Sequence, residues 1–231
     1  INKYLSANIG TSFTATMVNG RTYLMLDPRF AFKWQLANST SFKMSYTHMS
    51  QSLHRMASSF LELPTDFWVP TTNEIKPTMS HQIAAGIYTQ PSTHLTLSLE
   101  AYYKLSSHLL QYRHWMGFQP SAATWNRDVA DGKGKSYGME ADATYTTGST
   151  TMSMAYTLSW SKRLFKDIHP TWFDDQFDNR HKINISLSHD FSQRISLYAA
   201  WTCHSGNRVT MPVGYTIQPN IPGDNKYSYD Y

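Results

Sequence analysis

Residues 183–201 read INISLSHDFSQRISLYAAW and contain two runs in which apolar and polar side chains alternate. The apolar positions of the first run are Ile183, Ile185 and Leu187, and the second run follows the turn DFSQR at 190–194. Successive side chains of a β-strand point to opposite faces, so a period of two predicts a strand with one apolar and one polar face. The stretch is therefore predicted to be a β-hairpin.

The same alternation recurs along the whole chain, and helical periodicity is nearly absent. In LMLDPRFAFKWQL (24–36) the even-numbered residues are apolar, whereas Lys33 and Gln35 belong to the other face. Repeated alternation of this kind is typical of half-buried strands. We expect nine strands, around residues 5–15, 24–36, 42–47, 83–87, 95–104, 137–145, 152–160, 183–187 and 195–201. The predicted fold class is all-β, as an antiparallel barrel or sandwich.

The connections between these strands alternate in length. Short turns are expected at 36–40, 90–94, 147–150 and 190–194, and long loops at about 52–77, 108–134, 163–179 and from 206 onward. Soluble sandwiches have loops of mixed length at both ends, whereas outer-membrane barrels have short periplasmic turns and long extracellular loops. Strands of about 11 residues also suit a hydrocarbon core. The spacing favours a transmembrane barrel, with a soluble or surface-attached all-β binding module as the alternative.

The composition agrees with a barrel whose apolar face meets lipid and whose polar face lines a wet lumen. Charged residues make up only 16% of the 231-residue chain. Lys and Arg (20) against Asp and Glu (16) give a net charge of +4 without a basic run, so nucleic-acid binding is not expected. The single cysteine, Cys203, excludes an internal disulfide.

Several stretches resemble one family when they are taken in their order along the chain. They are YLMLDPRFAFKWQLANSTSFKMSYTHMSQSLHRMAS, LPTDFWVPTTNEIKPTMSHQIAAGIY, SLEAYYK, KSYGMEADATYTTG, AYTLSWSKRLF and FDNRHKINISLSHDFSQRISLYAAW. They resemble the C-terminal barrel portion of TonB-dependent outer-membrane receptors of the Bacteroidetes type. The resemblance implies a barrel of about 22 strands in the bacterial outer membrane, filled by an N-terminal plug.

On this basis we expect residues 1–231 to be part of one outer-membrane β-barrel domain, with the plug domain and the remaining strands absent. An odd strand number agrees, because bacterial single-chain barrels close with an even number. The resemblance implies TonB-dependent transport of a scarce nutrient: a siderophore, haem, cobalamin, a peptide or a glycan. Implied partners are outer-membrane lipid and lipopolysaccharide, the protein's own plug, the TonB complex through the absent N-terminal region, and a surface lipoprotein.

An outer-membrane barrel enzyme is a further alternative, but no GxSxG or comparable nucleophile context occurs, so we expect no enzymatic activity. The acidic stretch WFDDQFDNRH (172–181) could bind a divalent cation. Its spacing matches no Ca²⁺ loop, so we interpret Asp174, Asp175 and Asp178 as charges exposed to water at the top of a strand. Neither a metal nor a cofactor is expected.

Two other stretches are assigned to loops. DGKGKSYG (131–138) lacks the first glycine of a phosphate-binding loop, and we interpret it as a flexible loop that returns into a strand. SQSLHRMASSFLEL (50–63) has apolar residues at helical spacing and is predicted to contain a short helix on the barrel rim.

Aromatic residues in the predicted loops are the candidates for ligand contact, because such side chains stack on sugars, haem or aromatic chelators. The alternative is that they pack the loops together or lie at the lipid interface. The candidates are Trp115, Phe118, Trp125, Trp172 and Phe173.

Charged residues on the polar faces of the strands are expected to face the plug. We expect them to mix signs along neighbouring strands and to pair with the plug or with one another, because an unpaired buried charge is costly. These residues are Arg29, Lys33, Lys43, Glu100, Lys104, Glu140 and Asp142.

Overall fold

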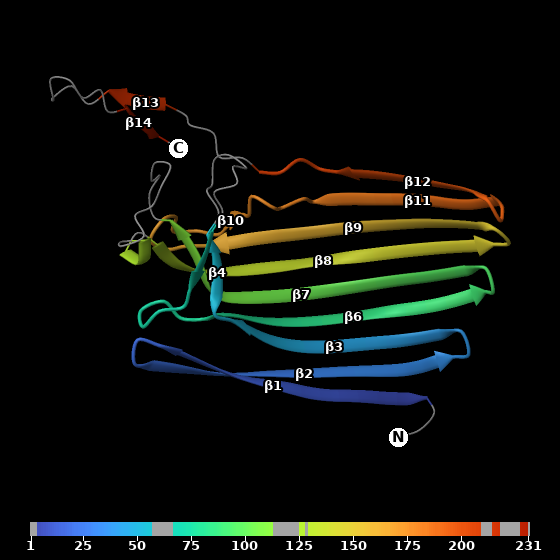
Figure 1. Ribbon diagram of the computed structural model, residues 1–231, viewed down its shortest axis with the longest axis horizontal. Helices are drawn as coiled ribbons and strands as arrows, with labels where there is room; N and C mark the ends of the chain where they lie inside the picture. Colours follow the sequence, from blue (N-terminus) through green and yellow to red (C-terminus); the bar gives the residue numbers. More distant parts are fainter. Residues whose placement is uncertain are drawn as a thin grey trace.

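The computed structural model describes residues 4–56, 67–112, 125–127, 129–208, 214–217 and 227–230. Within these ranges, nine long strands follow one another in chain order as a curved antiparallel sheet, and the two-residue strand β10 (Phe173–Asp174) joins it along β9 (Figure 1). The long strands are β1 (Leu5–Val18), β2 (Arg21–Ala37), β3 (Thr40–Gln51), β6 (Thr78–Ser92), β7 (Leu95–Tyr112), β8 (Val129–Thr147), β9 (Thr150–Leu164), β11 (His181–Ser192) and β12 (Ile195–His204). Each of them contains one of the nine predicted strands and extends beyond its predicted bounds.

The four predicted short turns are confirmed, and all of them lie at one end of the sheet, on the right in Figure 1. The longer connections lie at the other end. This end also carries the tight β1–β2 turn, where Asn19 and Gly20 have φ angles of 44° and 80°. Positive φ at both central positions is the requirement of a type I′ hairpin, which an Asn-Gly pair meets.

The two faces of the sheet differ as the alternation predicts. Large apolar side chains on the outward face are open to the surroundings: Ile9 is 79% exposed and Leu24 is 67% exposed. A soluble barrel would bury this set, so the exposure agrees with a wall that meets lipid. The opposite face is polar and lines a hollow of about 460 Å³. Across the described residues, the model contains no helix long and apolar enough to span a membrane.

Strands β7 and β8 run 18 and 19 residues, well beyond the roughly 9–11 that cross a bilayer. The predicted loop 108–134 is therefore shorter than expected, and DGKGKSYG is strand rather than flexible loop. Its glycines make room for neighbouring groups. A Cβ on Gly132 would come within 2.3 Å of the fully buried Phe165 ring, and one on Gly138 within 2.6 Å of the Leu158 carbonyl oxygen.

The connection between β3 and β6 contains a second, small sheet. Here β4 (Leu53–Met56) pairs with β5 (Phe67–Pro70), so the helix predicted for 50–63 is wrong at residues 50–56, and the rest of it lies outside the described residues. Met56 is 2% exposed and packs with Val69, Ile75 and Val129. This cluster, which we call the rim core, joins the β3–β6 and β7–β8 connections. A further pair, β13 (Gly214–Ile217) and β14 (Tyr227–Asp230), forms a separate two-stranded sheet.

Candidate functional site

The polar face of the wall carries its charges in two groups of opposite sign. In the strand register Lys33 is directly opposite Lys43, and Glu100 is directly opposite Glu140. Arg29 extends the basic group along β2, and Asp142, which accepts a hydrogen bond from Ser98 Oγ at 3.1 Å, extends the acidic group along β8. The expectation that signs mix between neighbouring strands is therefore wrong for these pairs. Lys104 is the exception, a cation on the otherwise acidic β7.

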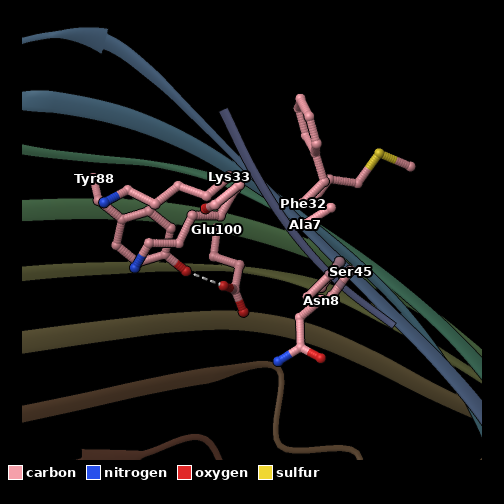
Figure 2. A pocket seen from close by; sticks show the side chains of 12 residues that line it. Ala7, Asn8, Phe32, Lys33, Ser45, Tyr88 and Glu100 are labelled. Atoms are coloured by element: carbon pink, nitrogen blue, oxygen red, sulfur yellow. Dashed lines mark hydrogen bonds between the residues drawn. The ribbon is translucent and has the colours of Figure 1, made fainter. Parts of the chain in front are cut away.

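Tyr88 lies between the two groups. Its hydroxyl donates a hydrogen bond to Glu100 Oε2, and the ammonium of Lys43 lies 3.8 Å from the centre of its ring. Figure 2 shows Lys33, Tyr88 and Glu100 on one side of the strands, with Phe32 on the other. Gly86 separates Lys43 from Glu100 in the same lateral row, where a Cβ would come within 2.8 Å of the Leu99 carbonyl oxygen.

Sequence reasoning missed Tyr88, although a signal for it exists. The apolar residues of β6 occupy odd positions such as Ile83 and Ile87, so an aromatic residue at 88 stands on the polar face.

The acidic stretch forms a buried network at the rim rather than a set of free charges. Asp175 and Asp178 are only 7% and 3% exposed, so the prediction of water-exposed acids is wrong for these two. Beyond Leu158 the edge of β9 has lost its partner β11, and the loop takes over that edge. The Ser159 amide donates to the Arg180 carbonyl, and the Ser161 amide donates to Asp178 Oδ1 at 2.7 Å.

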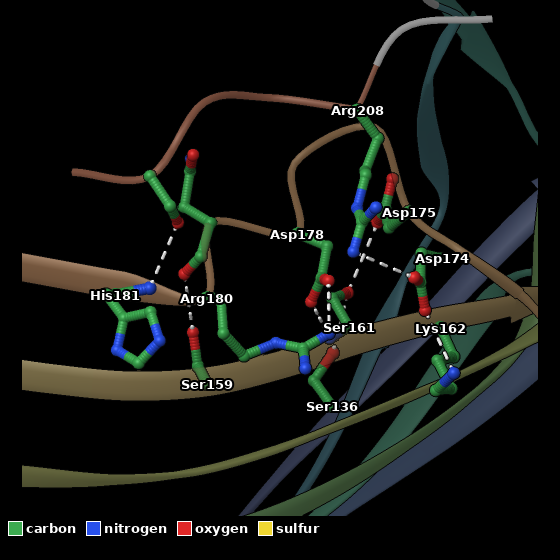
Figure 3. A network of polar contacts seen from close by, with 12 residues as sticks. Ser136, Ser159, Ser161, Lys162, Asp174, Asp175, Asp178, Arg180, His181 and Arg208 are labelled. Carbon is green, nitrogen blue, oxygen red and sulfur yellow. Dashed lines mark hydrogen bonds and ion pairs between the residues drawn. The ribbon is translucent and has the colours of Figure 1, made fainter.

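Cations balance each of these carboxylates, as Figure 3 shows for Asp178 and Asp174. Arg180 donates to Asp178 Oδ2 at 2.8 Å, and Arg163 Nε lies 2.8 Å from Asp175. Asp174 is bound by Lys162 at 2.9 Å and by Arg208 at 3.3 Å. The hydrogen bond from Lys162, with the charges of that lysine and of the arginines, holds the pKa of Asp174 below its usual value.

A histidine network joins the β4–β5 hairpin to β7 and β8. Thr78 donates its hydroxyl hydrogen to the His108 carbonyl at 2.9 Å, so the 3.0 Å contact with His54 Nδ1 requires the ring N–H to donate. His54 Nε2 then accepts from Thr71 Oγ1 at 3.3 Å. His108 Nδ1 in turn lies 2.7 Å from Asp131 Oδ2. Burial lowers the pKa of His54. The charge of Asp131 partly offsets this decrease in pKa, and His108 adds to it.

The segment 72–74 ties the β1–β2 tip to the β7–β8 connection. Tyr23 donates its hydroxyl hydrogen to the Thr72 carbonyl at 2.8 Å, and Arg21 donates to the Asn73 carbonyl at 2.9 Å. On the other side, the side-chain amide of Asn126 donates to Glu74 Oε2 at 3.1 Å. Asn126 lies in the 3-10 turn η1 (Trp125–Arg127). We call this set of contacts the rim tie.

The aromatic candidates occupy different places. Trp125 packs against the rim core, and Phe173 packs against Phe165 and His169 with ring centroids 6.3 and 5.8 Å away. Trp172 is 37% exposed, with the Lys135 ammonium 4.4 Å from its ring centre. Trp115 and Phe118 lie outside the described residues. The geometry of the described three agrees with loop packing, and ligand contact stays a prediction.

Among the described residues, no group of three or more His, Cys, Asp or Glu side chains is placed to hold a metal ion.

The sequence profile of the family described as TonB dependent receptor-like, beta-barrel matches residues 2–229. No curated protein matches the chain. Among solved structures, the FrpB iron transporter of Neisseria meningitidis (F3-3 variant) superposes with a TM-score of 0.55 at 17% identity, over 87% of this chain and 30% of that one. The apoprotein form of the F5-1 variant gives 0.53 at 16% identity, over 86% and 30%.

At these identities the structural likeness shows the fold alone, and this chain spans 30% of the length of those transporters. The profile match, however, covers nearly the whole chain and agrees with the lipid-facing wall and the polar inner face. The chain is a portion of an outer-membrane barrel and belongs to the TonB-dependent receptor β-barrel family.

Proposed function

We propose that this segment forms part of the wall and rim of a receptor that imports a scarce nutrient across the outer membrane, driven through TonB. The family is one of transporters, not enzymes. The observation that carries the proposal is the divided charge on the inner face, with Lys33 and Lys43 on one side of Tyr88 and Glu100 and Glu140 on the other. Like charges directly opposite each other destabilise a strand pair. A plug with complementary charges would offset that cost.

The plug would therefore present an acidic surface to β2–β3 and a basic surface to β7–β8. This assigns Arg29, Lys33 and Lys43 to one contact and Glu100, Glu140 and Asp142 to the other. Lys104, the cation on β7, would pair with an acidic residue within this basic surface of the plug. Under this arrangement the wall orients the plug by charge, and ligand capture falls to the long loops.

Charge reversal in the full-length receptor tests the docking. The double variant Lys33→Glu/Lys43→Glu is expected to loosen the plug, which raises its rate of proteolysis and makes cells sensitive to a bulky antibiotic that the outer membrane normally excludes. Lys166→Glu, a single charge reversal at an exposed position in the β9–β11 connection, is the control. Wild-type antibiotic exclusion and plug protection in the double variant, at normal amounts of inserted receptor, would contradict the assignment.

For the cargo we propose an iron-containing compound first, because the fold is similar to that of a transporter whose description names iron. Haem or a ferric siderophore would be such a compound. A cobalamin, a peptide or a glycan is the alternative cargo for the same barrel. Deletion of the complete gene should slow growth when iron is limiting, with growth restored by the intact gene. Growth that depends on the gene only when a glycan or a peptide is the nutrient would replace iron by that class.

The loop aromatics are proposed to contact the cargo: Trp115, Phe118, Trp125, Trp172 and Phe173. Trp172 is the most informative of them to change, because its ring is partly exposed. Trp172→Ala is expected to weaken cargo binding by about tenfold if stacking contributes about 1.4 kcal/mol. Trp201→Ala, on the outward face of β12, is expected to leave binding unchanged. We also propose a surface lipoprotein partner and a Bacteroidetes origin, which the genes beside the complete reading frame would reveal.

A further inference from the structure

A cationic and aromatic patch lies on the outward face of the wall, at the end that carries the long loops. In the β8–β9 ladder Tyr137 is opposite Trp160, and Lys135 is opposite Lys162 two residues nearer the rim. The rings of Tyr137 and Trp160 stack with centroids 5.3 Å apart. Tyr137 shares the face of Tyr103, whose side chain is 46% exposed, so the patch belongs to the lipid-facing side.

Two cations rest on the aromatic rings of this patch. The Lys135 ammonium lies 4.4 Å from the ring centre of Trp172, and the Arg180 guanidinium lies 5.0 Å from that of Trp160. Lys133, two residues from Lys135 on the same strand and therefore on the same face, is exposed. We call Lys133, Lys135, Lys162 and Arg180, with their supporting rings, the outward cationic patch.

The patch keeps an excess of positive charge. Lys162 is balanced by Asp174 and Arg180 by Asp178, but Lys133 and Lys135 form no ion pair with a carboxylate among the described residues. The nearest acid along the strand is Asp131, which is held by His108. Asp174 already neutralises Lys162, so an anion bound at Lys133 and Lys135 would balance the two cations of the patch that have no carboxylate partner in the described part of the chain.

The position of the patch specifies the kind of anion. Stacked aromatic side chains mark the interface between hydrocarbon and headgroups in outer-membrane barrels. Cations one step beyond that belt lie at the depth of lipid phosphates, and basic residues at this depth attract anionic lipid by about 1 kcal/mol each. We propose that the outward cationic patch binds the phosphate of an anionic lipid in the leaflet on the long-loop side.

Lipid binding to the full-length receptor in neutral detergent tests the proposal, with native mass spectrometry as the measurement. Diphosphorylated lipid A is the probe, and dephosphorylated lipid A and inorganic phosphate are the comparison arms. Lys133→Gln/Lys135→Gln is expected to weaken binding of the phosphorylated lipid by about 30-fold, since each lysine contributes about 1 kcal/mol. Wild-type receptor is expected to prefer the phosphorylated form over the dephosphorylated one.

Lys104→Gln is the matched control, because Lys104 is opposite Ser136 in the β7–β8 register and therefore at the same height on the opposite face. It removes one positive charge from the lumen, against two from the outward face in the double variant, and is expected to retain full lipid binding. Equal loss in Lys104→Gln, unchanged binding in the double variant, or equal affinity for dephosphorylated lipid would each overturn the proposal. Tighter binding of inorganic phosphate than of the lipid would also overturn it, in favour of a free-anion site.

Discussion

Asp178 holds the edge of β9 through its side chain, since its Oδ1 accepts the backbone amide hydrogen of Ser161 at 2.7 Å where a partner strand would otherwise supply a carbonyl. The carboxylate is almost fully buried, and its other oxygen binds Arg180. Asp178→Ala therefore leaves the Ser161 amide without its acceptor and Arg180 without its carboxylate, at a cost of about 1–3 kcal/mol in local opening.

Hydrogen exchange measured by mass spectrometry on peptides that cover 159–181 checks this prediction. Exchange should accelerate there and stay unchanged in β2–β3. Asp174→Asn, which alters the more exposed of these acids, should have a smaller effect. Equal protection in Asp178→Ala and wild type would show that the loop is held by other contacts.

Gly138→Ala should destabilise the barrel by about 1–3 kcal/mol, because overpacking forces the neighbouring backbone to move. The added methyl group would lie 2.6 Å from the Leu158 carbonyl oxygen and 3.0 Å from Ser159 Cβ. Gly10→Ala is the control, since nothing lies within 4 Å of a Cβ at that position. The measurement is the temperature at which the full-length barrel loses its compact form on gels, and equal temperatures for both variants would disprove the packing argument.

The rim should lose stability as the pH falls below about 6.5. His54 has a lowered pKa in the folded rim, so the unfolded segment binds more protons in this window and the free energy of unfolding rises with pH. The stability is fully present above 6.5 and decreases as the pH falls toward the folded value. The neighbouring groups that also act on His54 are Asp131 and His108.

Hydrogen exchange of residues 53–56, corrected for the intrinsic effect of pH, measures this dependence. His54→Gln should flatten it, whereas His204→Gln, an exposed position on β12, should not. A slope that survives in His54→Gln would assign the titration to another group.

Leu99→Lys should impair insertion of the barrel, at a cost of about 2–4 kcal/mol near the middle of the bilayer. Leu99 is 47% exposed on the outward face, whereas its neighbour Ser98 faces the lumen and donates to Asp142. Ser98→Lys should therefore be tolerated. Folding yield into lipid vesicles of the full-length protein distinguishes the faces, and equal yields would show that the face assignment is wrong.

The odd or even numbering of the apolar residues predicts the register between neighbouring strands as well as the strands themselves. In a regular two-residue hairpin, paired positions have an odd sum, so an even-numbered residue faces an odd-numbered one. The apolar residues before the turn at 147–150 are odd and those after it are even, and that ladder is regular. On both sides of the turn at 36–40 the apolar residues are even-numbered. They can share one face only if one strand contains an extra residue, and the register does shift between Gln35 and Ala37.

The same count holds at two further turns, where the register shifts between Thr89 and Ser92 and between Asp190 and Ser192. The basic pair follows from the first of these shifts, since Lys33 is opposite Lys43 only because of it. The rim is different. Asp178 replaces a backbone carbonyl at the edge of β9, and it can do so only because β11 ends before that point. The alternation of apolar and polar residues does not predict where a strand loses its partner.

The rim tie has a mechanical consequence. Residues 72–74 join the tip of the β1–β2 hairpin to the turn that contains Asn126 in the β7–β8 connection. In the sheet, strands β3 and β6 lie between β2 and β7. A force that bends one side of the mouth outward must stretch these contacts as well as the sheet. The tie therefore stiffens this part of the mouth and helps to keep its aperture constant.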